Sequence, residues 1–492
     1  MMMATVSHAL KVTLLDRLKG IFSGLAQCKL VNLRDAYQLC GSRVRIPFEG
    51  FPIQLLLGGK QGKTLHLYPE YSMNLEDNPA PSNFILFDPE RYNREISGFL
   101  RLAPGSHLVL GRDDPEQQAM FDYPASVAGQ HLRLSHAGDA IIFRNLAPDG
   151  TCVSPVLDQE KFCRLNKLRR IRQLFGGAIE PLEPKAALAL AEQATELTRK
   201  EPYRPADSRG EPGGLIRLPP ELTPIVIGDL HAKVDNLLVI LSQNGFLEGL
   251  ETGRACLVFL GDEVHSEVDG QMEDMDDSIL MMDLIFRLKV RFPDRVFLIR
   301  GNHESFSEEI AKDGIPQGLL WAKALRDARG KRYLKAMETY YRAMPYVVVS
   351  EDFACCHAAP PKSKITLEML VELGRYPGLI KELINNRMYR ANRPAGYTKG
   401  DIRRFRKALG LAPDTPFIVG HTPLDRTDTL WLNAGGMPNH HILYSAADNW
   451  VGVFTRVGGK MVPLRYPTES LATLLNGLDR HPIAQREASS AA

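Results

Sequence analysis

The hydrophobic positions divide the chain into two parts with different patterns. From about residue 45 to 155, short apolar segments such as PIQLLLGG and DAIIFRNL alternate with turn residues, which is typical of an all-β unit. After residue 215, buried-looking strands such as TPIVIGDLH alternate with amphipathic helices such as VDNLLVILSQNG. This alternation predicts a layered α/β core. The predicted fold class is therefore α/β, with an all-β sandwich domain before the α/β part.

The same pattern places the domain boundaries. HALKVTLLDRLKGIFSGLAQ shows apolar spacing near the helical period of about 3.6 residues. The stretch EPYRPADSRGEPGG at 201–214 is rich in proline, glycine and charge, so we predict a linker there. The predicted parts are a helical segment (1–45), an all-β domain (46–156), a helical connection and linker (157–214), an α/β domain (215–470) and a C-terminal tail (471–492).

Composition excludes several classes of protein. Hydrophobic residues make up 44% and charged residues 24% of the chain, which excludes wholesale disorder. With a net charge of only +2, the protein has no strong overall electrostatic attraction to nucleic acid or to an anionic membrane. No apolar run approaches the ~20 residues that cross a bilayer, and the N-terminus lacks a signal-peptide core. The seven cysteines form no disulfide framework or paired zinc motif, so we expect a cytoplasmic protein.

Several predicted strands of the second half end in loops that carry metal-binding types of side chain. Because such loops converge at the carboxyl ends of strands, we expect these side chains to meet, and the preceding glycines let the backbone approach a small ion. Carboxylate, amide and imidazole together suit manganese, iron or zinc better than calcium. Six ligands are about right for two ions that share a carboxylate. The candidates are Asp229, His231, Asp262, Asn302, His357 and His421.

The segments around these loops resemble the phosphoprotein phosphatase family of calcineurin-like metallophosphoesterases. The resemblance covers about residues 220 to 465 and is carried by DDSILMMDLIFRLKVRFPDRVFLIRGNHE, YYRAMPYVVVSEDFACCHAAP, ANRPAGYTKGDIRRFRKAL and LYSAADNWVG. It implies a central β-sandwich flanked by helices, with a site for two divalent ions. Manganese is the expected metal, with iron or zinc as alternatives.

The resemblance also implies a role for each site residue. His303 would be the general acid that protonates the leaving oxygen, and a water between the two ions would be the nucleophile. Arg393 would bind the phosphoryl oxygens, Asn302 would lie near the same group, and Arg300 is a candidate second contact. One ion would be held by Asp229, His231 and the bridging Asp262, and the other would be completed by Asn302, His357 and His421.

One loop departs from the family pattern. Where family members have GDxVDRG, this chain has GDEVHSE at 261–267. His265 stands where an aspartate normally orients the general acid, and Ser266 stands where an arginine normally binds phosphate. A shifted loop that supplies Asp269 is an alternative source of the carboxylate.

A second departure concerns the aromatic side chain near the site. Trp450 stands where the family has a tyrosine, so it either walls the substrate pocket or packs beneath the loop. A roomier mouth walled by Trp450, with fewer cationic contacts, would favour phosphotyrosine over phosphoserine.

The first half resembles a forkhead-associated (FHA) domain over about residues 95 to 155. The resemblance is carried by Leu110-Gly111-Arg112, by the segment around His131 and by Asp149-Gly150-Thr151. It implies a sandwich that binds phosphothreonine peptides, with Arg112 as a phosphate contact. Ala128 and Asp149 replace the usual serine and asparagine, so a degenerate sandwich used for packing is the alternative.

Together these features predict a metal-dependent phosphoprotein phosphatase, a phosphoric monoester hydrolase, whose first domain recruits substrate or acts as a scaffold. Two alternatives remain at this stage. One is a hydrolase of small phosphorylated molecules, such as dinucleoside polyphosphates. The other is a phosphopeptide-binding adaptor whose catalytic site is weakened by His265 and Ser266.

Overall fold

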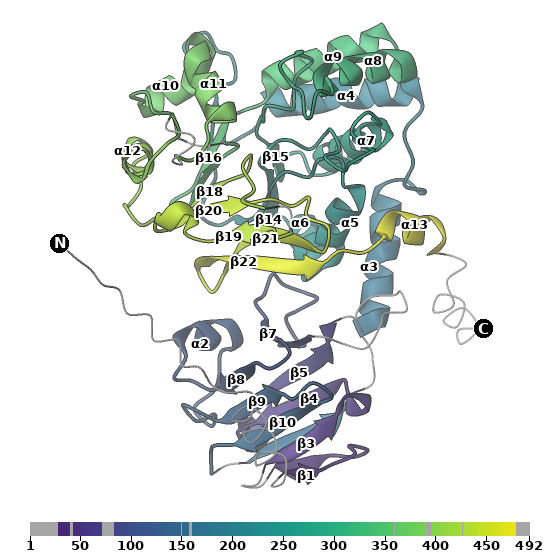
Figure 1. The fold of residues 1–492 in the computed structure, drawn as a ribbon, viewed down its shortest axis with the longest axis vertical. Helices are drawn as coiled ribbons and strands as arrows, with labels where there is room; N and C mark the ends of the chain where they lie inside the picture. Colours follow the sequence, from purple (N-terminus) through teal and green to yellow (C-terminus); the bar gives the residue numbers. More distant parts are fainter. Residues whose placement is uncertain are drawn as a thin grey trace, which may run out of the picture. The chain divides into compact units, whose positions relative to one another are not determined.

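The chain forms two compact units in the computed structural model (Figure 1). The first unit comprises Met1–Pro89 and Phe99–Lys161, and the second comprises Glu90–Gly98 and Phe162–Ala492. The structure describes residues 28–39, 43–70, 83–148, 150–156, 160–358, 360–389, 395–425 and 427–478. Most of the predicted N-terminal helical segment and of the C-terminal tail lies outside the described residues. No helix in the described ranges is long and apolar enough to cross a membrane.

Among its described residues, the first unit contains two sheets and a short α-helix, α2 (Pro115–Phe121). The sheet orders are β1-β3-β10-β9-β8 and β2-β11-β4-β5-β6-β7. Buried and partly exposed residues alternate in strands such as β4 and β9, and the buried side chains of both sheets form one core. The strands are β1 (Lys29–Leu30), β2 (Tyr37–Leu39), β3 (Val44–Pro47), β4 (Ile53–Leu57), β5 (Lys63–Pro69), β6 (Phe84–Phe87), β7 (Leu100–Leu102), β8 (His107–Leu110), β9 (Leu132–His136), β10 (Ala140–Asn145) and β11 (Thr151–Pro155).

The second unit is a mixed α/β fold built on two further sheets. Their strand orders are β12-β16-β17-β18-β20-β19 and β15-β14-β13-β21-β22. Residues of both sheets, including Val258 and Ile418, pack into one apolar cluster. The strands are β12 (Leu215–Arg217), β13 (Thr223–Ile227), β14 (Ala255–Phe259), β15 (Val296–Leu298), β16 (Val347–Val349), β17 (Ala354–Cys356), β18 (Phe417–Val419), β19 (Leu430–Trp431), β20 (His440–Leu443), β21 (Trp450–Val457) and β22 (Lys460–Pro467).

Helices cover the outer faces of these sheets (Figure 1). The cluster that includes Leu370, Leu383 and Phe405 packs α10–α12 against the first of the two sheets, while α4 packs on α7, α8 and α9. The helices are α3 (Glu160–Leu174), α4 (Pro184–Arg199), α5 (Val234–Ser242), α6 (Phe246–Glu251), α7 (Asp276–Arg291), α8 (Gln317–Arg329), α9 (Lys331–Ala343), α10 (Leu367–Val371), α11 (Pro377–Asn385), α12 (Lys399–Ala408) and α13 (Leu471–Asn476).

Strand direction decides where the loops of the second unit gather. Strands β13, β14 and β15 pair in parallel, and β17 pairs in parallel with β18. Each group of parallel strands therefore brings its C-terminal loops to one edge of its sheet, where α/β proteins place their ligands. The central strands are buried along their whole length, as expected where both faces are covered.

The segment 201–214 differs from the predicted linker. Glu201 is buried and accepts from the Lys289 ammonium at 2.7 Å. Arg204 donates to the carbonyls of Thr198 at 3.2 Å and Ala343 at 2.6 Å, which lie in the last turns of α4 and α9. Helix ends leave such carbonyls without intrahelical partners, so Arg204 joins two helix ends. The segment is thus packed into the second unit through these polar contacts and through Tyr203, whose ring centroid lies 6.1 Å from that of Phe297.

The buried Lys289–Glu201 pair makes the helical layer sensitive to a single substitution. We expect Lys289→Met to lower the free energy of unfolding by about 3–5 kcal/mol, because Glu201 would keep its charge in the interior without its main partner. Urea denaturation followed by the helical circular-dichroism signal measures the loss. Lys335→Met, at an exposed position of α9, is the control and should change stability by less than ~0.5 kcal/mol. Equal stability of the two variants would contradict the role of the pair.

Candidate metal centre

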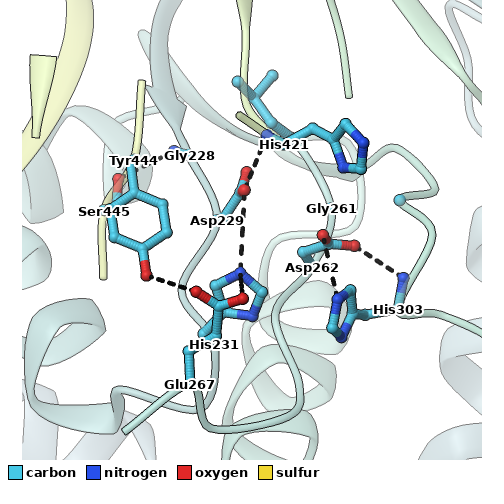
Figure 2. Close-up of polar contacts among 12 residues, drawn as sticks. Gly228, Asp229, His231, Gly261, Asp262, Glu267, His303, His421, Tyr444 and Ser445 are labelled. Carbon is cyan, nitrogen blue, oxygen red and sulfur yellow. Dashed lines mark hydrogen bonds and ion pairs between the residues drawn. The ribbon is translucent and has the colours of Figure 1, made fainter. Parts of the chain in front are cut away.

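The loops at the ends of five strands bring the predicted ligands together. Two groups of three side chains each place one ligand atom per residue within 4.8 Å of the others. Asp262 belongs to both groups, so its carboxylate lies between them. Figure 2 shows Asp262 near Asp229 and His231. The groups are Asp229, His231 and Asp262, and Asp262, His357 and His421. Asn302 adjoins the second group, with its Oδ1 3.0 Å from His357 Nε2.

Backbone carbonyls orient two of the histidines. The Nδ1 of His231 lies 3.2 Å from the carbonyl oxygen of His265, and the Nδ1 of His357 lies 2.9 Å from that of Leu260. An N–H at each Nδ1 donates to these oxygens, which leaves the Nε2 lone pair for the centre of the cluster. Metal-binding histidines are commonly fixed by such a contact to the other ring nitrogen.

Buried polar atoms without partners indicate that the cluster fits cations. Asp229 Oδ1 and His421 Nε2 are buried and have no hydrogen-bond partner among the described residues. Leaving such atoms unpaired costs free energy, and a metal ion satisfies both a carboxylate oxygen and an imidazole lone pair. The oxygen and nitrogen donors of the whole set match a borderline divalent ion.

The carboxylates and histidines shift one another's pKa. Burial, aided by the charge of Asp262, raises the pKa of Asp229 to about 7. Burial alone would lower the pKa of His357, but Asp262 outweighs it and raises that pKa to about 9. Without cations, protons on histidine therefore supply positive charge beside the buried carboxylates. Cations and protons compete for the same atoms, so metal affinity should increase with pH.

Glu304 ties two of the ligand loops together. Its buried carboxylate accepts from the backbone N–H groups of Gly301 at 2.8 Å, Asp262 at 3.0 Å and Glu263 at 3.3 Å. Glu263 in turn accepts from the N–H of Gly261 at 3.1 Å. Burial raises the pKa of Glu304, and burial together with Glu304 raises the pKa of Glu263 well above its usual value. These contacts fix the position of Asp262 relative to the loop of Asn302.

Two glycines are required because aspartate oxygens lie directly against the backbone. A Cβ at Gly420 would lie 2.0 Å from Asp229 Oδ1, and a Cβ at Gly301 would lie 2.3 Å from Asp262 Oδ1. Both distances are far below contact separation. The glycines predicted to let the backbone approach an ion thus also make room for the carboxylates that would hold it.

His303 lies beside the bridging aspartate and against His265. Its backbone N–H donates to Asp262 Oδ1 at 2.8 Å, and its Nδ1 lies 2.8 Å from the Nδ1 of His265. One of these nitrogens donates and the other accepts, so the two rings share one proton at this contact. Burial lowers the pKa of His303 to about 4, against the opposing effect of Asp262. Burial and the neighbouring His303 lower the pKa of His265 well below its usual value.

Glu267 is a site residue to which the sequence assigned no ligand role. Its Oε1 lies 3.7 Å from His231 Nε2, and it forms a third group of potential ligands with His231 and His303. The Tyr444 hydroxyl donates to Glu267 Oε2 at 3.2 Å (Figure 2), and the Lys312 ammonium contacts Oε1. Burial would raise the pKa of Glu267, but His231 and Lys312 outweigh it and lower the pKa to about 2. Glu267 is therefore an anion beside the cluster.

Comparison with known proteins agrees with this geometry. Residues 222–441 match the family of calcineurin-like phosphoesterases. The C-terminal part of the chain contains a calcineurin-like phosphoesterase domain. Figure 2 shows several of the candidate metal-binding side chains of that domain.

Two serine/threonine-protein phosphatases are similar in sequence to part of this chain. Serine/threonine-protein phosphatase rdgC of Drosophila melanogaster is 29% identical over 158 residues, which is 32% of this chain and 22% of that protein. The catalytic subunit of serine/threonine-protein phosphatase 4 from Kluyveromyces lactis is 37% identical over 84 residues, which is 17% of this chain and 23% of that protein. The chain thus spans less than a quarter of the length of these curated relatives.

Solved structures of two phosphatases are also similar. A protein serine/threonine phosphatase from Saccharomyces cerevisiae, with similarity to human phosphatase PP5, is 18% identical and gives a TM-score of 0.44 over 59% of this chain and 91% of that chain. The cold-active protein-tyrosine phosphatase of a Shewanella species is 14% identical and gives a TM-score of 0.36 over 51% of this chain and 82% of that chain.

A cavity of about 220 Å³ opens beside His231 of the phosphoesterase domain. Its aromatic lining residue is Tyr444, whose ring centroid lies 5.8 Å from that of His231. The cavity is lined by His231, Lys233, Glu267, Val268, Asp269, Tyr444, Ala446 and Asp448. Trp450, predicted either to wall the substrate pocket or to pack beneath the loop, is not among these lining residues. It begins β21, and the guanidinium carbon of Arg465 lies 5.1 Å from the Trp450 ring centroid.

The remaining predicted residues lie elsewhere or outside the described ranges. Arg300 donates to the Tyr346 hydroxyl at 3.3 Å and lines a different cavity, so its side chain is not part of the metal cluster. Arg393 lies outside the described residues. In the first unit, Arg112 is exposed and its Nε donates to the Val127 carbonyl. Asp269 lines the cavity, while His265 is the side chain that contacts His303.

The Glu304 contacts generate a prediction about metal affinity. In Glu304→Gln an amide N–H would face backbone N–H donors, so the loops that carry Asp262 and Asn302 should separate. We expect manganese affinity to fall by about 10- to 100-fold, as for other groups that orient metal ligands. Calorimetric titration of the metal-free protein measures it. Glu308→Gln, an exposed change in the same loop, should leave the affinity unchanged. Equal affinities of both variants would contradict the role of Glu304.

Proposed function

We propose that this protein is a metal-dependent phosphoprotein phosphatase, that is, a phosphoric monoester hydrolase. The observation that carries the proposal is the position of Asp262, which belongs to two adjacent groups of metal-binding side chains. A shared carboxylate is the arrangement by which two ions clamp an in-line phosphoryl displacement. The match of residues 222–441 to calcineurin-like phosphoesterases and the names of the relatives support the same activity.

The residues present fit two divalent ions, of which we propose manganese, with iron or zinc as alternatives. Such ions, when bound, supply an acidified water for attack and neutralise charge on the phosphoryl group. Asp262 would contact both ions. The first ion would also be held by Asp229 and His231, and the second by Asn302, His357 and His421.

His303 is the proposed general acid. Its backbone is fixed by Asp262 and its ring by His265, so the Nε2 edge is positioned at the cluster, 3.9 Å from Asp262 Oδ2. A proton given from this ring to the leaving oxygen would lower the barrier most for poor leaving groups. We propose that Arg393 binds the phosphoryl oxygens through its planar fork.

Turnover should depend on added metal and on Asp262. We expect the protein to hydrolyse an aryl phosphate with manganese and to lose this activity in EDTA. Asp262→Asn should lower the rate at least ~100-fold, because the shared negative charge is lost. Diadenosine tetraphosphate, assayed beside phosphopeptides, tests the small-molecule alternative and should be the poorer substrate. Full activity in EDTA or in Asp262→Asn would refute the two-ion site.

The role of His303 can be separated from that of Arg393 by leaving-group dependence. His303→Asn should preserve metal content and slow phosphoserine peptides far more than activated aryl phosphates, since their leaving oxygen has the higher pKa. Arg393→Ala should instead raise KM for every substrate. Steady-state kinetics on both substrate types measure the difference. If His303→Asn slows both types equally, His303 is not the general acid.

We further propose a preference for phosphotyrosine, set by the 261–267 loop. Ser266 is buried, and its hydroxyl accepts from the Val268 N–H at 3.2 Å, so this position offers no cation to a phosphoryl group. The relatives are named serine/threonine-protein phosphatases, so a different preference in this protein should arise where its sequence departs from the family pattern, which is this loop. The Tyr444 ring beside the site offers an aromatic contact to a phenyl ring.

The specificity prediction compares matched peptides. We expect a higher kcat/KM for phosphotyrosine than for phosphoserine or phosphothreonine in the same sequence. His265→Asp combined with Ser266→Arg should shift the preference toward phosphoserine, because it restores a carboxylate beside His303 and a cation at the mouth. A phosphoserine preference that this double change leaves unaltered would show that the loop does not set specificity.

For the first unit we propose an FHA-like sandwich that recruits phosphorylated partners or packs as a scaffold. Arg112 is exposed in the loop after β8, at the predicted phosphate contact. His131 is buried and its Nδ1 accepts from the Ala128 N–H at 3.1 Å, which supports a structural role for that histidine. Asp149 lies outside the described residues. We also propose a cytoplasmic location, on the sequence grounds above.

A further inference from the structure

Arginine side chains dominate the lining of a second cavity in the phosphoesterase unit. It has a volume of about 490 Å³, within the range of about 300–1,000 Å³ that small-molecule sites occupy. The end of α4, the segment 204–214, Arg300 and the end of α9 all contribute to it. Its charged lining residues are Arg199, Arg204, Arg209, Arg300, Arg342, Asp207 and Glu211. Five cations therefore face two carboxylates.

Two of the five arginines already make hydrogen bonds or ion pairs within the protein. Arg204 donates to the carbonyls of Thr198 and Ala343, as described above. Arg209 contacts Asp207 Oδ2 through Nε at 3.0 Å and Nη2 at 2.8 Å, so this pair is neutral. Neither arginine is therefore available to a ligand without loss of an existing contact.

The other three arginines make fewer or weaker contacts with the described residues. Arg300 contacts only the neutral Tyr346 hydroxyl among the described side chains, and its Nε is buried with no hydrogen-bond partner among them. Arg342 is exposed at the end of α9 and makes no side-chain hydrogen bond or ion pair with any described residue. Arg199 has one contact with Glu196 at 3.2 Å, in which both side chains are largely exposed. Such an exposed pair contributes little and is readily exchanged for a stronger anion.

We propose that this cavity binds the phosphoryl group of a small phosphorylated molecule through Arg300, Arg342 and Arg199. Guanidinium groups present fixed, paired donors that match phosphate oxygens, and Arg cannot lose its charge near neutral pH. The site is distinct from the metal cluster, and it requires no bound cation.

The position of Arg300 connects this cavity to the metal cluster. Its backbone N–H donates to the Pro345 carbonyl at 2.8 Å, and it lies two residues before Asn302 in the same loop. Tyr346, its hydrogen-bond partner, also lines the cavity. A ligand that draws the Arg300 guanidinium away from Tyr346 would act on the loop that carries Asn302 and His303. Occupancy of the cavity should therefore change turnover at the metal site.

The test is calorimetric titration of the metal-free full-length protein with inorganic phosphate and, in a second arm, with ribose 5-phosphate. We expect one site per chain, with affinity at least about tenfold weaker in Arg342→Ala and in Arg300→Gln. Two variants serve as controls that should bind normally. Arg332→Ala removes the same charge from α9 outside this cavity, and Arg393→Ala removes the cation proposed to bind phosphate at the metal cluster. Tighter binding of the ester would identify an organic phosphate as the ligand, and equal binding would identify free phosphate.

Three outcomes would overturn the proposal. The first is no heat of binding at about 10 mM of either probe. The second is an equal loss of affinity in Arg332→Ala, which would indicate general attraction to basic surface. The third is normal binding in Arg342→Ala and Arg300→Gln with loss of binding in Arg393→Ala, which would place the anion at the metal cluster. Since binding is measured without metal, failure of the phosphatase assay would leave this result unaffected.

Discussion

Two fully buried aspartates at the ends of neighbouring parallel strands impose the constraint on which the rest of the site depends. Asp229 follows β13 and Asp262 follows β14, and the two strands pair directly. Two carboxylates in an apolar interior are strongly unfavourable unless positive charge and hydrogen-bond donors surround them. Two features of the cluster meet this requirement. Imidazoles from other loops approach them, and backbone N–H groups of His303 and His421 donate to them at 2.8 Å.

The backbone around these aspartates is held in conformations that side chains rarely adopt. His231, Asp262, His265 and His421 all have positive φ, between 44° and 69°. Each such residue costs of order 1–3 kcal/mol and persists only where the surrounding structure enforces it. Here the enforcing elements are the two packed sheets and the contacts of Glu304. Positive φ at several clustered side chains that can bind metal is typical of a functional site, where the arrangement of ligands matters more than local stability.

How far the sequence predicts this site depends on the range of each interaction. Asp229, Asp262 and His357 can be predicted because each directly follows a strand, and strand ends meet by topology. The contacts of Glu267 cannot be predicted in this way, since its partners Lys312 and Tyr444 come from distant segments with no local signal. The segment 201–214 was predicted to be a linker because hydrophobic pattern cannot show that a polar residue is buried by an ion pair. Trp450 and Arg300 were assigned by position in a motif, which does not fix where a side chain points.

The distribution of cations explains why the two anion sites should behave differently. Beside the metal cluster, Lys233 contacts Asp448 and Lys312 contacts Glu267, so these two ammonium groups are already neutralised by carboxylates. A phosphoryl group there would meet Glu267 and the buried aspartates, and its charge would have to be balanced by bound cations or by Arg393. In the arginine-lined cavity, by contrast, the positive charge that would bind phosphate comes from arginine side chains of the protein and not from bound ions. Phosphate binding at the first site should therefore depend on divalent ions or on Arg393, whereas binding at the proposed second site needs no divalent ion and should weaken as ionic strength rises.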